Sequence, residues 1–144
     1  MATYRTSVSS PRPPADVFGY MARFSNAALW DPGVAVAADV TPGPPALGST
    51  YRLQVRFLGL TVPLDYRIEE IDAPRRVVLG AENSQFRSTD RIEVAEASGG
   101  GSTVRYEATL TPKGVAAAFS PLIGVVFRHV GGRAATGLRA ALAA

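Results

Sequence analysis

The stretch SPLIGVVFRHVGGRAATGLRAAL, residues 120–142, decides the fold. Ser120 and Pro121 are typical of a helix N-cap and first turn. Apolar residues then recur at helical spacing, whereas the arginines occupy other positions. The residues predicted to share the apolar face are Phe119, Ile123, Val126, Val130, Ala134 and Leu138. A helix of about twenty residues rises roughly 30 Å, so this element is long enough to cover a whole sheet.

The segment 34–112 predicts the sheet that this helix would cover. Apolar and polar residues alternate with period two in successive runs, and Gly- or Pro-containing turns separate the runs. Strands this closely spaced favour an antiparallel meander. The residues predicted to face inward are Val34, Val36, Ala38, Val40, Tyr51, Leu53, Val55, Phe57, Val62, Leu64, Tyr66, Ile68, Phe86, Ser88, Asp90, Ile92, Val94, Val104, Tyr106, Ala108 and Leu110.

The N-terminal segment adds one strand and two short helices. Residues 3–10 alternate as a half-buried strand, and residues 14–24 carry apolar side chains at helical spacing. A second short helix ends at Trp30, where Asp31-Pro32-Gly33 favours a turn. The predicted fold is therefore α+β, a helix-grip: a curved, seven-stranded antiparallel sheet wraps around the long C-terminal helix, and two short helices follow the first strand. Residues 1–144 form one domain, since no linker or repeat is visible.

Composition excludes several classes of function. The chain is 47% hydrophobic and 19% charged, which indicates a globular domain. Cysteine is absent and His129 is the only histidine, so neither a disulfide framework nor a Cys- or His-rich metal site is expected. Nor do the residues show a G-x-S-x-G, P-loop or Rossmann pattern, so we expect no cofactor. His129 has no acidic partner at helical spacing and is interpreted as a surface residue rather than a base.

Charge and hydropathy suggest a compartment and exclude some partners. The net charge is +3, but the arginines are scattered singly or in pairs, so no nucleic-acid partner is expected. The first residues lack the apolar core of a secretory signal. The weakly polar run 114–127 is too short to span a bilayer and is interrupted by Ser120-Pro121, so no stable membrane insertion is expected. We expect a cytoplasmic protein, either monomer or dimer.

Polar residues on the predicted inner face indicate a chamber. Tyr51, Tyr66 and Tyr106 all lie in the apolar phase of their strands, and a buried hydroxyl without a partner costs about 1–3 kcal/mol. Their hydroxyls either meet in a semi-polar chamber or reach water at its rim. Asp90 shares a face with Phe86, and there it would be paired, hydrogen-bonded or protonated. Alternatively, a β-bulge reverses its phase, or it lies at an open mouth.

Trp30 is the only tryptophan, and it comes directly before a turn. One interpretation is that it shapes a ligand chamber. The other is that it closes the end of the core, because large aromatic side chains mostly contribute packing.

Three stretches resemble a known family: PRPPADVFGYMARFSNAALWDPGV (11–34), YRIEEIDAPRRVVL (66–79) and SGGGSTVRYEATL (98–110). Together with the order of elements, they are similar to the bacterial polyketide cyclase/dehydrase and lipid-transport (SRPBCC) family of the START-like, Bet v 1-type superfamily. The resemblance covers nearly the whole chain. It implies a deep apolar cavity under the C-terminal helix that holds a lipid-like or polycyclic ligand. Some members are aromatases or cyclases and others only bind or carry, so no catalytic residue is assigned from it.

Two functional hypotheses follow. The first is binding of a hydrophobic small molecule between the sheet and the C-terminal helix, which the absence of a catalytic motif favours. The alternative is a cofactor-independent cyclase, aromatase or dehydratase acting on a polyketide-like substrate in the same cavity, and a protein-interaction module is a third option. The predicted cavity residues are Trp30, Tyr51, Leu53, Tyr66, Phe86, Asp90, Tyr106, Ile123, Val126 and Val130.

Glycines inside the predicted C-terminal helix suggest a gate for the ligand. Gly124, Gly131, Gly132 and Gly137 each lower helix propensity by about 1 kcal/mol relative to Ala. Packing must therefore hold this helix in place, and we expect the loss of a few contacts to loosen it.

Overall fold

The computed structural model describes residues 1–57 and 59–143. The strands are β1 (Ala2–Ser10), β2 (Val34–Asp39), β3 (Thr50–Phe57), β4 (Leu60–Asp72), β5 (Arg76–Glu82), β6 (Phe86–Glu96) and β7 (Ser102–Pro112). The α-helices are α1 (Pro14–Ala22), α2 (Ala27–Trp30) and α3 (Ser120–Leu142). Short 3-10 helices are η1 (Phe24–Asn26), η2 (Ser98–Gly100) and η3 (Gly114–Phe119).

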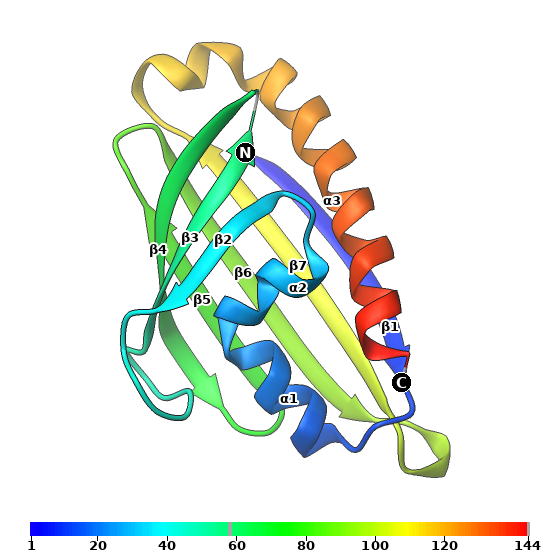
Figure 1. Cartoon of the computed structure of the whole chain (residues 1–144). Coiled ribbons are helices and arrows are strands. Elements are labelled where there is room, and N and C mark those ends of the chain that lie inside the picture. The colour runs from blue at the N-terminus through cyan, green and yellow to red at the C-terminus, as the bar shows by residue number, and fades with distance from the viewer. Residues whose placement is uncertain (58, 144) are drawn as a thin grey trace.

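The strands form one antiparallel sheet in the order β1-β7-β6-β5-β4-β3-β2. Figure 1 shows it curling around the helices, with α1 and α2 at one end and α3 along one side. The first strand closes beside the last, as in the pair Val8 and Val104. This seven-stranded helix-grip confirms the predicted α+β fold.

The α1 and α2 helices seal one end of the sheet. Pro14 occupies the first turn of α1, where its missing N–H costs nothing, and Val17 and Met21 are buried on one face. The chain then turns through η1 and α2, and Trp30 ends α2 with its side chain buried. These elements put large apolar side chains against the concave face, so this end of the molecule is closed.

The long α3 helix lies at one edge of the sheet rather than over its centre. It packs chiefly along β1 and against α2, with few contacts to β7 (Figure 1). Ala134, Leu138 and Leu142 are its buried contacts toward the core. Because one helix at the edge cannot fill a wide concave surface, space remains between α3 and the inner face of the sheet.

The predicted inward face of residues 34–40 and the predicted apolar face of the C-terminal helix are each partly wrong. The register of β2 shifts between Val34 and Val36, which is a β-bulge, so Val34 stays buried while Val36 is 61% exposed. The predicted inward position Val40 follows β2 and is 48% exposed. Phe119 is 57% exposed, because it ends the 3-10 helix η3 and does not continue the α-helical period of α3.

By length and composition alone, the segment Gly114–Leu142 could cross a membrane. The segment is not one continuous α-helix, since it changes from 3-10 to α-helix at Ser120. Its last turns pack on the domain, with Leu138 and Leu142 almost fully buried. The C-terminal half of α3 therefore packs as part of the folded domain.

Candidate ligand-binding cavity

A cavity lies between the concave face of the sheet and α3. Its open space, including the mouth, is about 980 Å³, and the centre of a water molecule can occupy about 110 Å³ of it. Residues from β1, η1, α2, β2, β3, β4, β6, β7 and α3 form its walls, and most of these side chains are apolar. This space is large enough for several water molecules or a small organic ligand.

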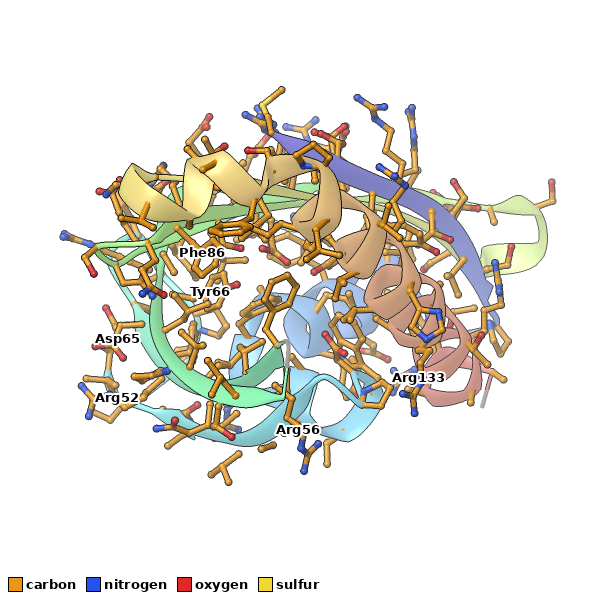
Figure 2. All side chains as sticks on the ribbon, turned by 90° about the horizontal axis from the view of Figure 1, so that it is seen from above. Arg52, Arg56, Asp65, Tyr66, Phe86 and Arg133 are labelled. Carbon is orange, nitrogen blue, oxygen red and sulfur yellow. The ribbon has the colours of Figure 1, made fainter. Side chains whose placement is uncertain are left out.

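Most of the predicted cavity residues meet at this space. Figure 2 shows Tyr66 and Phe86 pointing into it, whereas Arg52 and Asp65 point outward from the same sheet. The predicted residues that line it are Trp30, Leu53, Tyr66, Phe86, Asp90, Tyr106 and Val130. They come from separate elements, so the curl of the sheet is what brings them together.

Three other predicted cavity residues do not line it. Tyr51 lies in the main core with its hydroxyl buried and without a hydrogen-bond partner among the described residues. Ile123 is buried in a separate cluster with Phe86 and Leu110. Val126 is only half-buried and is not among the lining residues, although Phe127 and Val130 beside it on α3 are. Tyr51 and Ile123 are buried on the predicted faces of β3 and α3. Each lies at a position along its strand or helix that is outside the cavity.

Trp30 combines the two roles considered for it. It is 4% exposed, and its ring meets the Tyr106 ring edge-on at 5.6 Å between centroids. The same side chain belongs to the main core and to the cavity wall. A residue at the end of α2 can do both, because the cavity begins where the packing of the closed end stops.

Asp90 faces the cavity and is 4% exposed. Tyr106 Oη donates to Asp90 Oδ2, and Ser88 Oγ lies 3.5 Å from Asp90 Oδ1. Tyr66 Oη is 2.8 Å from Ser88 Oγ, so four side chains from three strands form one chain of hydrogen bonds. The pairing of β6 with both neighbours is regular here, so no bulge reverses the phase of Asp90.

Burial controls the proton on this network. It raises the pKa of Asp90 to about 7; the hydrogen bond from Tyr106 opposes this rise, and the charge of Asp31 adds to it. The pKa values of Tyr66 and Tyr106 are raised well above the ordinary value, first by burial and then by the Asp90 charge. The tyrosines therefore stay protonated donors, while Asp90 titrates near neutral pH.

Asp31 is a second carboxylate in the cavity wall that the sequence reasoning missed. Its Oδ1 accepts a 2.8 Å hydrogen bond from the Gly33 N–H, as turn-forming Asp residues do. Burial raises its pKa to about 6, against the lowering effect of that hydrogen bond. The sequence Asp-Pro-Gly explains the turn completely, so nothing in it signals that this side chain also lines a cavity.

Aromatic side chains from elements far apart in the sequence form another part of the wall. Phe57 and Phe86 meet edge-on at 5.9 Å, and Phe127 of α3 packs on the same cluster. Phe24 meets Tyr66 at 4.9 Å nearer the closed end. Phe24 and Phe127 were not predicted as cavity residues, because helical spacing alone does not distinguish a cavity wall from a filled core.

No metal centre is visible among the described residues, where His, Cys, Asp and Glu form no group of three or more. The side chain of His129 is exposed on α3, away from the cavity. The chemistry that the described lining offers is therefore carboxyl, hydroxyl and aromatic.

Comparisons with known proteins agree with this architecture. The family model for polyketide cyclase/dehydrase and lipid transport matches residues 1–144. A START superfamily protein from Mycobacterium smegmatis superposes with a TM-score of 0.78 at 11% identity, covering 99% of this chain and 97% of that one. The major latex-like protein 151 of Panax ginseng gives 0.69 at 9% identity, covering 99% and 98%.

The di-domain ARO/CYC protein BexL from the BE-7585A biosynthetic pathway gives a TM-score of 0.67 at 18% identity, covering 99% of this chain and 45% of that one. Identities this low establish a shared fold and nothing about ligands. The comparison with curated proteins finds no match. Because the family model spans the whole chain and the helix-grip fold agrees with it, the chain belongs to the polyketide cyclase/dehydrase and lipid-transport family.

Proposed function

We propose that this protein binds a hydrophobic small molecule in the cavity between the sheet and α3. The observation that carries the proposal is the cavity itself, an apolar space with a single hydrogen-bonded network in its wall. Ligand sites commonly combine a mostly apolar lining with a few convergent polar groups. The apolar wall would supply affinity, and the network around Asp90 would orient one polar end of the ligand.

Native mass spectrometry of the purified protein would test for a co-purified ligand. Binding of the neutral dye Nile red, followed by its fluorescence, would test the cavity directly. Ala134 lines the cavity and is 8% exposed, so Ala134→Phe should fill the space and weaken dye binding about tenfold or more. The matched control is Ala140→Phe on the exposed face of α3. Equal dye binding by both variants would contradict binding in this cavity.

A second candidate function is cyclisation or dehydration of a polyketide-like substrate in the same space. One observation favours it: burial raises the pKa of Asp90 to about 7, where a carboxyl can both give and take a proton. Asp90→Asn separates the two functions. A general acid or base lost in this way would lower turnover about 10²-fold or more while binding persists, whereas an anchor would lose only some affinity.

A further inference from the structure

The charge of the cavity wall has one sign. Asp31 and Asp90 are the charged side chains among the described lining residues, which include no Lys, Arg or His. Two arginines on elements that line the cavity act elsewhere: Arg56 donates to the Pro32 carbonyl, and Arg133 is exposed on α3, both away from the cavity interior in Figure 2. With two carboxylates and no cation, the wall favours positive charge and opposes negative charge in a ligand.

The hydrogen bonds at Asp90 use up the donors nearby. Tyr106 donates to one carboxylate oxygen, and Ser88 is placed to donate to the other. Tyr66 must then donate to Ser88, because the Ser88 proton is already engaged. With Asp90 ionised, these three hydroxyls have no proton left for a ligand. This part of the wall offers acceptors, so the ligand has to bring donors.

Asp31 has the same need. One of its oxygens is satisfied by Gly33, while its Oδ2 accepts no hydrogen bond from the described residues. Asp31 is half-buried, so water reaches it in the empty protein, and an ammonium group in the cavity would replace that water with a charged donor. The cavity therefore contains two carboxylates whose acceptor capacity exceeds what the described protein atoms supply.

Aromatic rings lie in the same cavity wall as these carboxylates. Trp30 and Tyr106 form one edge-on pair, and Phe24 and Tyr66 form another, and all four side chains line the cavity. Ring faces attract cations, most strongly where water is excluded. The attraction of a cation to the ring faces adds to its attraction to the carboxylates, and both favour the same kind of ligand.

We infer that the cavity selects ligands that join an apolar body to a protonated amine, held by Asp31 and Asp90, and rejects carboxylic acids. The inference rests on the proposed function, since it names the ligand class for the same cavity. An ammonium group supplies several N–H donors and the missing positive charge. A carboxylate would place a third negative charge beside two others.

Binding of an amine is expected to release a proton. Burial raises the pKa of Asp90 to about 7, so part of the empty protein carries a neutral carboxyl at that pH, and the proton passes to the buffer when an ammonium ion pairs with it. The other titratable groups facing this site are Asp31 after α2, Tyr66 on β4, Tyr106 on β7 and Tyr4 on β1. The described cavity-lining residues of α3 and β3 include no titratable group.

Three probes of equal size test the inference: naphthylmethylamine, naphthylmethanol and naphthoic acid, each measured by calorimetry. At about pH 8 the amine should bind about tenfold or more tightly than the alcohol, and the acid should bind weakest. Amine affinity should rise with pH up to about pH 7, where Asp90 becomes ionised, and then level off. Alcohol affinity should not rise with pH.

The variants Asp31→Asn and Asp90→Asn should each reduce the preference for amine over alcohol, and the double variant should abolish it. Asp65→Asn is the control, because Asp65 pairs with Arg52 on the outer face of the sheet (Figure 2). If the alcohol binds as tightly as the amine to the wild type, the ligand class is wrong while binding in the cavity stands. If none of the three probes binds, the proposed function itself is contradicted.

Discussion

The two halves of α3 share one apolar period but differ in what covers them. In the C-terminal half, Ala134, Ala135, Leu138 and Leu142 are buried against the rest of the domain. In the N-terminal half, Ile123 on the same face packs on the small cluster around Phe86 instead, and Val126 is only half-buried; Leu122, on the opposite side of the helix, is 55% exposed. The difference shows that periodicity defines a helix face, whereas the partners of that face depend on which elements reach it.

The glycines of α3 also differ in what lies next to them. A Cβ at Gly137 would overlap with the Trp30 carbonyl, and one at Gly131 would lie 2.5 Å from the Tyr4 ring. Both glycines therefore allow a close approach of α3 to its neighbours. A Cβ at Gly132 would meet nothing within 4 Å. The gate hypothesis treated all these glycines alike, but Gly131 and Gly137 have a packing reason at their Cβ, whereas Gly132 and Gly124 would accept a methyl group without a clash.

The same substitution placed in each half gives the largest contrast. Leu138 is 1% exposed, so Leu138→Ala should lower the free energy of unfolding by about 3 kcal/mol through lost burial and the cavity left behind. Leu122→Ala should change it by less than about 0.5 kcal/mol, because Leu122 already faces solvent. Urea unfolding at equilibrium measures both. Similar losses would mean that the two halves are equally packed.

Two glycine substitutions in α3 test how closely this helix approaches α2. Gly137→Ala should lower the free energy of unfolding by about 2–3 kcal/mol, because the new methyl group forces α3 away from the backbone of α2. Its control is Gly132→Ala, which should raise it by about 0.5–1 kcal/mol through helix propensity alone. Thermal or urea unfolding measures the change in the free energy of unfolding for both variants. Stabilisation by Gly137→Ala would show that α2 and α3 do not touch as described.

The pH dependence of stability tests whether Asp90 in the cavity wall is shielded from water. A carboxyl with a pKa of about 7 when folded, against 3.8 ordinarily, binds its proton more tightly in the folded state. Stability should therefore fall as pH rises from about 4 to about 7, and level off above that. Asp90→Asn should remove this part of the fall, and at about pH 8 it should raise the free energy of unfolding by about 2 kcal/mol. The full pKa shift of Asp90, at about 1.4 kcal/mol per unit, sets an upper limit on this gain. We expect roughly half of that limit, because Asn still buries a polar amide.

Urea unfolding of wild type and Asp90→Asn across this pH range measures the effect, and Asp65→Asn serves as the exposed control. The residual dependence in Asp90→Asn should come from Asp31 and end near pH 6. A pH profile unchanged by Asp90→Asn would mean that Asp90 reaches water.

The candidate site was predictable only in part. Trp30, Tyr66, Asp90 and Tyr106 could be proposed because their types are unusual for their predicted positions, a polar atom in an apolar phase or a large ring beside a turn. Asp31 could not, since a turn explains it without a cavity. Tyr51 and Tyr66 give the same signal in the sequence, because both lie in the apolar phase of paired strands and their Cα atoms are partners. Only Tyr66 lines the cavity, and the alternation does not distinguish the two.

Local sequence patterns were enough to predict the helices and strands and the buried face of most of them. Alternation, helical spacing and turn residues act over a few neighbouring positions, so the seven strands, the short helices and α3 are readable from the chain. Three features became visible only in the folded molecule: α3 lies along β1, a bulge turns Val36 outward, and Asp31 and Asp90 line one apolar space. These outcomes depend on how far the sheet curls and where the helix docks. Both are set by packing between residues distant in the sequence, which no local pattern encodes.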